Sequence, residues 1–230
     1  MPPLVSRKNV VRGVSVVGYA CVLCTISKAD ETPAYVQHVQ STISAAVAGV
    51  SRPRVLEVGI GDAINLASYP RGTRLVGLDA RLPSKQDQKL TSDRARDEYG
   101  VELFWVQGDV CKMPFDDGLF DSVVATKVLC SVSDPQQCVG EISRVLRKGG
   151  RFGYVEHVAA DVGTLLEKSQ LLLDPAQQAL AGGCHLHRET DAMLRQSVSA
   201  GLFDEVETAE RYVALLMWPI AQQAAGVLRR

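Results

Sequence analysis

Residues 54–63 read Arg-Val-Leu-Glu-Val-Gly-Ile-Gly-Asp-Ala, an apolar strand that runs directly into two glycines. Gly59 and Gly61 allow a sharp turn, and they let the backbone approach a ligand closely. In open α/β sheets, ligands bind beyond the carboxyl ends of the strands, where such a turn lies. The stretch therefore predicts the first strand of an α/β sheet, with a ligand site directly after it.

The glycine loop does not match two common phosphate-binding motifs. A dinucleotide fingerprint needs a third glycine where Ile64 stands, and a phosphate-loop ATPase needs Gly-Lys-Ser/Thr, which does not follow here. Glu57 lies directly before the loop, where its carboxylate would repel a pyrophosphate. The same carboxylate suits a ligand that carries a positively charged amino-acid end.

Acidic residues recur at the ends of the next two predicted strands. Asp79 ends the second strand, and Asp109 follows the third. A carboxylate at the second strand end can accept hydrogen bonds from both hydroxyls of a ribose. Asp109 can accept from an adenine amino group, while the Val110 N–H donates to a ring nitrogen. Together with Glu57, these residues predict a site for S-adenosylmethionine.

Helix and strand patterns alternate along the chain from Pro33 onward. Apolar runs bounded by turn residues predict strands, and apolar positions at helical spacing predict helices. The predicted strands cover 54–59, 73–79, 101–107, 120–126 and 151–157, and the predicted helices cover 34–50, 84–99, 135–147 and 164–181. Strands that alternate with helices are joined by parallel crossovers, which indicates a doubly wound sheet.

Two further predicted strands, 203–208 and 212–217, are too close together for a helix between them and indicate an antiparallel hairpin. The predicted fold class is α/β, with a Rossmann-like, doubly wound, seven-stranded sheet that is mostly parallel and has a terminal antiparallel hairpin. No repeat or linker interrupts the pattern. Residues 33–230 are therefore predicted to form one domain, and residues 1–32 an N-terminal extension.

The composition of the 230-residue chain excludes several classes of protein. The hydrophobic fraction of 46% and the charged fraction of 22% are close to globular averages, which excludes global disorder and a coiled coil. A formal net charge of −1 provides no basic surplus for nucleic-acid phosphates, so no nucleic-acid partner is predicted. Six cysteines are too sparse for a disulfide framework, which favours a reducing compartment.

The N-terminal extension has a composition of its own. No acidic residue precedes Asp30, and an uncharged, mostly apolar run spans 13–27 between basic flanks. This run is shorter than the roughly 20 residues that a helix needs to cross a bilayer. Three interpretations stay open: association of residues 10–28 with a membrane surface, an organellar presequence, or a helix packed on the domain. Cys21 and Cys24 have redox-motif spacing but are interpreted as small apolar residues.

The site and the strand pattern resemble the seven-strand, Rossmann-like methyltransferases that use S-adenosylmethionine. The likeness includes Phe115-Asp-Asp-Gly-Leu-Phe-Asp121 before the fourth strand and Arg144-Val-Leu-Arg-Lys-Gly-Gly150 before the fifth. It covers residues 53–157 and implies an S-adenosylmethionine-dependent methyltransferase. The predicted cosubstrate-binding residues are Glu57, Gly59, Gly61, Asp79, Asp109, Val110 and Thr126.

Other segments resemble a narrower family, the membrane-associated alkyl-thiol S-methyltransferases. They are Val128-Leu-Cys-Ser-Val132, Glu156-His-Val-Ala159, Leu173-Asp-Pro-Ala176 and Gly183-Cys-His-Leu-His-Arg-Glu189. In that family an N-terminal apolar segment anchors the protein to the endoplasmic reticulum or to lipid droplets. The resemblance implies an alkyl-thiol acceptor and a membrane-associated protein with a cytosol-facing domain. The presequence interpretation implies a mitochondrion or plastid instead.

Methyl transfer from a sulfonium is an in-line displacement, so the protein chiefly aligns the acceptor and excludes water. The acceptor is expected over the ends of the fourth and fifth strands, lined by 126–130, Glu156 and His157. His157 is the predicted catalytic base. Lys127 is a second candidate, because its charge can lower the pKa of a thiol.

Cys184, His185 and His187 suggest a metal site, because alternate residues of an extended segment share one face. No second ligand pair at zinc-like spacing exists in the chain, so no metal is predicted. The segment is interpreted as a cap on the acceptor pocket.

The sequence predicts a methyltransferase for a small lipophilic acceptor. Two alternatives are methylation of a quinone or lipid precursor, and a catalytically silent scaffold that binds S-adenosylmethionine. The intact cosubstrate-binding residues argue against the scaffold.

Overall fold

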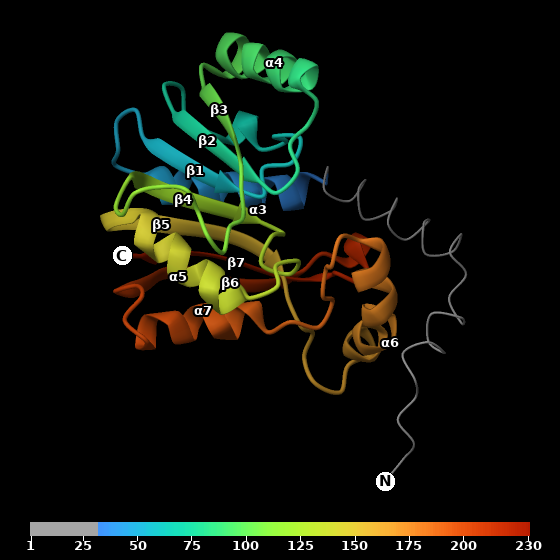
Figure 1. Ribbon diagram of the computed structural model, residues 1–230. Helices are drawn as coiled ribbons and strands as arrows, with labels where there is room; N and C mark the ends of the chain where they lie inside the picture. Colours follow the sequence, from blue (N-terminus) through green and yellow to red (C-terminus); the bar gives the residue numbers. More distant parts are fainter. Residues whose placement is uncertain (1–31) are drawn as a thin grey trace.

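A seven-stranded sheet with the strand order β3-β2-β1-β4-β5-β7-β6 organises the chain. The computed structural model describes residues 32–230, and Figure 1 shows this sheet with helices packed against it. The strands are β1 (Arg54–Val58), β2 (Arg74–Asp79), β3 (Glu102–Gln107), β4 (Phe120–Thr126), β5 (Leu146–His157), β6 (Glu205–Val213) and β7 (Gln222–Arg229). The α-helices of this part of the chain are α3 (Pro33–Val47), α4 (Lys85–Arg94), α5 (Pro135–Val145), α6 (Leu165–Leu180) and α7 (Thr190–Ser199).

The five strands from β1 to β5 pair in parallel, while β7 pairs antiparallel with both β5 and β6. The sheet confirms the predicted fold class. Strand order reverses between β1 and β4, because the chain first builds outward through β2 and β3 and then returns to the other side of β1. Ligands of doubly wound sheets bind at such a reversal, beyond the carboxyl ends of the strands.

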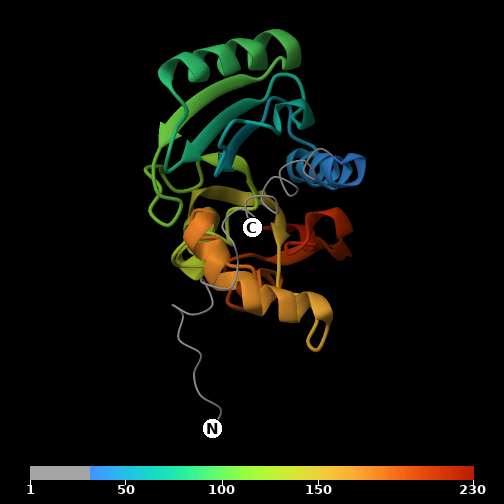
Figure 2. The same ribbon diagram turned by 90° about the vertical axis from the view of Figure 1, so that its right-hand side faces the viewer.

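Alternating side chains of the strands supply two hydrophobic cores, one on each face of the sheet. Val55 and Val124 pack on the face that α3 covers, whereas Leu56 and Val123 pack on the face that α5 and α7 cover. In Figure 1, α3 lies behind the strands and α5 and α7 lie in front of them. Figure 2 shows α4 beside the β3 edge of the sheet, far from α6.

Helix α5 illustrates how the local sequence positions one of these elements. The Asp134 side chain accepts a hydrogen bond from the Gln137 backbone N–H at 2.9 Å, and Pro135 occupies the first turn. Both features favour a helix start. The buried positions of α5 recur at helical spacing, and one of them, Cys138, forms a disulfide with Cys111 in the loop after β3. The spacing of the cysteines did not predict this disulfide.

The predicted terminal hairpin exists, but the predicted bounds of its second strand were wrong. Residues 212–217 fall at the end of β6 and in the short 3-10 helix η3 (Leu215–Met217), and the second strand is β7. Residues 222–228 of β7 are all buried, so the alternation that marks a half-exposed strand is missing there. Helix α7 was also missed, because 190–199 carries few large apolar side chains.

Candidate active site

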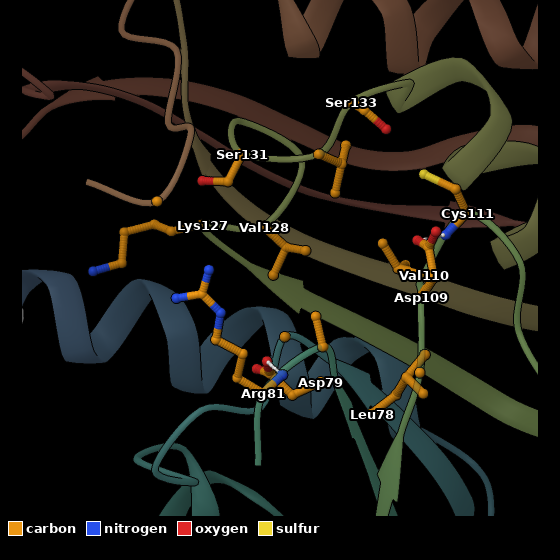
Figure 3. Close-up of a pocket in the computed structure, with 15 residues that line it drawn as sticks. Leu78, Asp79, Arg81, Asp109, Val110, Cys111, Lys127, Val128, Ser131 and Ser133 are labelled. Atoms are coloured by element: carbon orange, nitrogen blue, oxygen red, sulfur yellow. Dashed lines mark hydrogen bonds between the residues drawn. The ribbon is translucent and has the colours of Figure 1, made fainter. Parts of the chain in front are cut away.

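A pocket of about 520 Å³ opens over the carboxyl ends of β1, β2 and β3 and beside the loop after β4. Its volume lies in the usual range for small-molecule sites, about 300–1,000 Å³. Four of the seven predicted cosubstrate residues line it: Gly59, Asp79, Asp109 and Val110. In Figure 3, Asp109 lies toward one end of the pocket and Lys127 toward the other.

Asp79 is held in place by two backbone donors. Its Oδ2 accepts a hydrogen bond from the Gly61 N–H at 3.0 Å, and its Oδ1 accepts one from the Arg81 N–H at 2.9 Å. A carboxylate offers about four acceptor positions, so further acceptor capacity remains for the hydroxyls of a ribose. Gly61 itself does not line the pocket; it orients Asp79 from behind.

Gly59 explains why the loop needs glycine at this position. Its φ angle is +66°, in the left-handed region, and its N–H donates to the Leu78 carbonyl at 2.7 Å. A Cβ atom on residue 59 would lie 2.3 Å from Cγ2 of Val128. The turn therefore brings the strand ends of β1 and β2 together and leaves Val128 room at the pocket wall.

Asp109 and Val110 belong to a loop that is tied down at several points. The Asp109 Oδ1 atom accepts a hydrogen bond from the Cys111 N–H at 2.8 Å, and Cys111 is bonded to Cys138 of α5. The Gln137 side chain also donates to the Cys111 carbonyl at 2.9 Å. These contacts hold Asp109 and the Val110 N–H at the pocket, where the predicted adenine contacts need them.

Glu57 does not line the pocket. Its side chain is 1% exposed; Oε1 accepts from Asn65 Nδ2 at 2.7 Å, and Oε2 accepts from the Tyr69 hydroxyl at 2.8 Å. Burial raises the pKa of Glu57 to about 7, although both hydrogen bonds oppose the rise. The Asn65 amide also donates to the Thr126 hydroxyl at 3.1 Å, so Glu57 and Thr126 belong to one buried network beside the loop.

Sequence reasoning missed Asn65 and Tyr69. The signal available in the sequence was these two polar residues shortly after the glycine loop, where they flank the short 3-10 helix η1 (Leu66–Ser68). The roles of Glu57 and Thr126 in holding the cosubstrate stay predictions, since neither residue lines the pocket.

His157 lies at the end of β5 and is also absent from the pocket lining. It is 1% exposed, and its Nε2 atom lies 3.1 Å from the Cys184 Sγ. Its neighbour Glu156 points elsewhere: Oε1 accepts from the backbone N–H groups of Val128 and Leu129 at 2.8 and 3.0 Å. Burial raises the pKa of Glu156, and these donors oppose the rise. The catalytic role of His157 stays a prediction.

The loop after β4 forms the other wall of the pocket. Lys127, Val128 and Ser131 line it together with Gly182, which lies two residues before the segment 184–187 that was predicted to cap the acceptor pocket. Lys127 has a φ angle of +55°, and its Nζ atom lies 5.2 Å from the centre of the Tyr35 ring. Arg81, Ser133 and Gly182 were not predicted as lining residues, because nothing local in the sequence marks them.

Comparisons with known proteins agree with this geometry. Residues 56–153 match the family described as "Methyltransferase domain". The human thiol S-methyltransferase TMT1A is 38% identical over 146 residues, which cover 63% of this chain and 59% of that protein. The human thiol S-methyltransferase TMT1B is 33% identical over 189 residues, which cover 81% of this chain and 74% of that protein.

Among solved structures, a protein of Bacillus halodurans C-125 has the same fold. The TM-score is 0.64 at 16% sequence identity, and the alignment covers 83% of this chain and 97% of that one. At this identity the likeness supports the fold alone.

Proposed function

Because the chain belongs to the family of the thiol S-methyltransferases TMT1A and TMT1B, we propose that it methylates the thiol of a small lipophilic acceptor. The family confirms the predicted methyltransferase class and its cosubstrate, S-adenosylmethionine. The aligned region spans only 59% of TMT1A and 74% of TMT1B. The thiol acceptor named for these relatives is therefore a proposal for this chain. The observation that carries it is one pocket that joins the acidic strand ends to the wall after β4.

The acidic end of the pocket suits the adenosine part of the cosubstrate. We infer that Asp109 and the Val110 N–H receive the adenine ring, and that Asp79 receives the ribose hydroxyls. The bound cosubstrate supplies an electrophilic methyl group on its sulfonium. Lys127 lies at the end of the pocket opposite Asp109, with Val128 between the two, and the acceptor would enter on the Lys127 side.

The chain's own residues would favour a thiolate acceptor in three ways. Lys127 lines the pocket with its Nζ atom 5.2 Å from the centre of the Tyr35 ring, and turning this side chain toward the acceptor would favour the ionised form of a thiol. Val128 presents an apolar wall that suits an alkyl group and excludes water. The Glu156 carboxylate accepts hydrogen bonds from the Val128 and Leu129 N–H groups, which keeps this wall in position.

The acceptor is tested with methyl-labelled S-adenosylmethionine and a panel of alkyl thiols, phenols and quinone precursors. We expect label on the alkyl thiols.

Lys127→Met should lower the rate near neutral pH, with the rate recovering as the pH approaches the thiol's own pKa, because the variant loses the charge that favours the thiolate. Asp116→Ala, which removes an exposed charge outside the pocket lining, serves as the control. Label only on quinone precursors, or intact cosubstrate binding with no transfer, would contradict the proposal.

We further propose that residues 10–28 associate the protein with a membrane surface. These residues lie outside the described part of the chain. Within residues 32–230, no helix is both long enough and apolar enough to cross a bilayer. Support comes from the basic flanks of the apolar run and from exposed leucines of the described part, including Leu165 on α6 and Leu215 and Leu216 in η3.

The membrane proposal predicts that the full chain pellets with vesicles of phosphatidylcholine and phosphatidylserine. A chain starting at Asp30 should stay in the supernatant and still bind S-adenosylhomocysteine. Each Lys or Arg near an anionic surface contributes about 1 kcal/mol, so changing Arg7, Lys8 and Arg12 to Gln should weaken pelleting. A full chain that stays in the supernatant would contradict the proposal. A mature protein that begins after the apolar run would favour the presequence, and loss of folding in the shortened chain would favour a packed helix.

A further inference from the structure

Three potential metal ligands meet just behind the wall of the pocket. Cys130 comes from the loop after β4, His157 from the end of β5, and Cys184 from the segment after α6. One ligand atom from each lies within 4.8 Å of the other two. All three residues are buried, with exposed fractions of 2%, 1% and 7%.

Hydrogen bonds join the segment that carries Cys184 to the loop that carries Cys130. The His185 N–H donates to the Cys130 carbonyl at 2.9 Å. One guanidinium nitrogen of Arg188 donates to the Leu129 and Val132 carbonyls at 2.6 and 2.9 Å. These contacts hold the two thiols beside each other independently of any direct bond between them.

The side chains of the cluster also lie close to one another. The His157 Nε2 atom lies 3.1 Å from the Cys184 Sγ. His157 Nδ1 is buried without a hydrogen-bond partner among the described residues.

We propose that Cys130, His157 and Cys184 bind one thiophilic divalent metal ion, with Zn²⁺ as the expected occupant. Two sulfurs and an imidazole nitrogen are a ligand set that zinc prefers, at about 2.3 Å to sulfur and 2.0–2.1 Å to nitrogen. Both cysteines bind the metal as thiolates, so the protons that their thiols carry leave to solvent as the ion binds. A water molecule can complete the tetrahedron.

The two histidines that the sequence placed next to Cys184 are not part of this cluster. His185 Nδ1 lies 3.9 Å from an Asp174 carboxylate oxygen, and His187 Nε2 lies 3.7 Å from one of Glu167. The metal would join the segment 181–188 to the ends of β4 and β5. Since Gly182 of that segment lines the pocket, the metal would act as a structural support for the acceptor wall.

The test uses the full chain, stripped with a chelator and titrated with Zn²⁺ by calorimetry. We expect one equivalent in the wild type, and loss of stoichiometric binding in Cys184→Ser and in Cys130→Ser. His185→Ala is the matched control on the same segment and should keep one equivalent. The double variant Cys21→Ser, Cys24→Ser should also keep it, which excludes the Cys-x-x-Cys pair as the ligand.

Cobalt provides a readout that a purely structural role for the cysteines would not give. Co²⁺ should produce thiolate-to-metal charge-transfer bands in the wild type and in His185→Ala, and weaker bands in Cys184→Ser. Zinc should also raise the Tm of the wild type but not of His157→Gln. The proposal is overturned by unchanged zinc binding in both cysteine variants, by a cobalt complex without thiolate bands, or by a Cys130–Cys184 disulfide in place of metal.

Discussion

Asp79→Ala is expected to weaken the binding of S-adenosylhomocysteine by about 10- to 150-fold. Hydrogen bonds to a charged group contribute about 1.5–3 kcal/mol, and the variant loses the carboxylate that receives the ribose hydroxyls. The variant also loses the hydrogen bonds that the Gly61 and Arg81 N–H groups donate to the Asp79 carboxylate. The glycine loop is therefore less well ordered for the ligand. Calorimetric titration with S-adenosylhomocysteine measures the change.

Two controls separate this effect from a loss of folding. Asp116→Ala removes a negative charge from an exposed position outside the pocket and should leave affinity unchanged. Asp79→Asn keeps one side-chain oxygen as an acceptor and should fall between the wild type and Asp79→Ala. Undiminished affinity in a folded Asp79→Ala protein, or tight binding of NAD in place of S-adenosylhomocysteine, would refute the assignment of the site.

Gly59→Ala is expected to lower cosubstrate affinity by at least about tenfold and to destabilise the fold by about 1–2 kcal/mol. The stability cost arises because alanine at a φ of +66° is in the left-handed region. The affinity cost arises because the new Cβ would lie 2.3 Å from Val128 Cγ2, so Val128 has to move at the pocket wall. Urea unfolding measures the first effect, and calorimetry measures the second.

Gly61→Ala is the matched control for this prediction. Gly61 also has a positive φ of +49°, but a Cβ there meets nothing within 4 Å, and the residue does not line the pocket. It should therefore show a similar loss of stability with a much smaller loss of affinity. Equal losses of affinity in the two variants would show that backbone strain, rather than the contact with Val128, controls binding.

Hydrogen bonds within short loops shape one end of the pocket, and hydrogen bonds between distant segments shape the other. Its acidic end depends on short-range features, because Asp79 and Asp109 each bond a backbone N–H two residues further along the chain. Its acceptor wall depends on long-range contacts, because Glu156 on β5 holds the N–H groups of Val128 and Leu129 after β4. We therefore expect substitutions of the acids to change cosubstrate affinity, and substitutions around Glu156 to change the acceptor specificity.

The sequence by itself determined the fold class, the succession of strands β1 to β5 along the chain and the loops that bear the candidate cosubstrate residues. It could do so because these features are local. Apolar periodicity marks each strand, glycine marks the turn at residue 59, and an acid at a strand end lies at the same edge of a parallel sheet as its neighbours. The family-level function followed from the same local motifs.

Only the tertiary structure decided which side chains reach the pocket and which are buried behind it. Glu57 is adjacent to the glycine loop in sequence, yet Asn65 and Tyr69 enclose its carboxylate, because strand alternation turns it away from the pocket. The position of β7 also required the structure, since a strand covered on both faces lacks alternation. His157 meets Cys184 across 27 residues of sequence, and such a contact depends on how distant segments pack rather than on any local pattern.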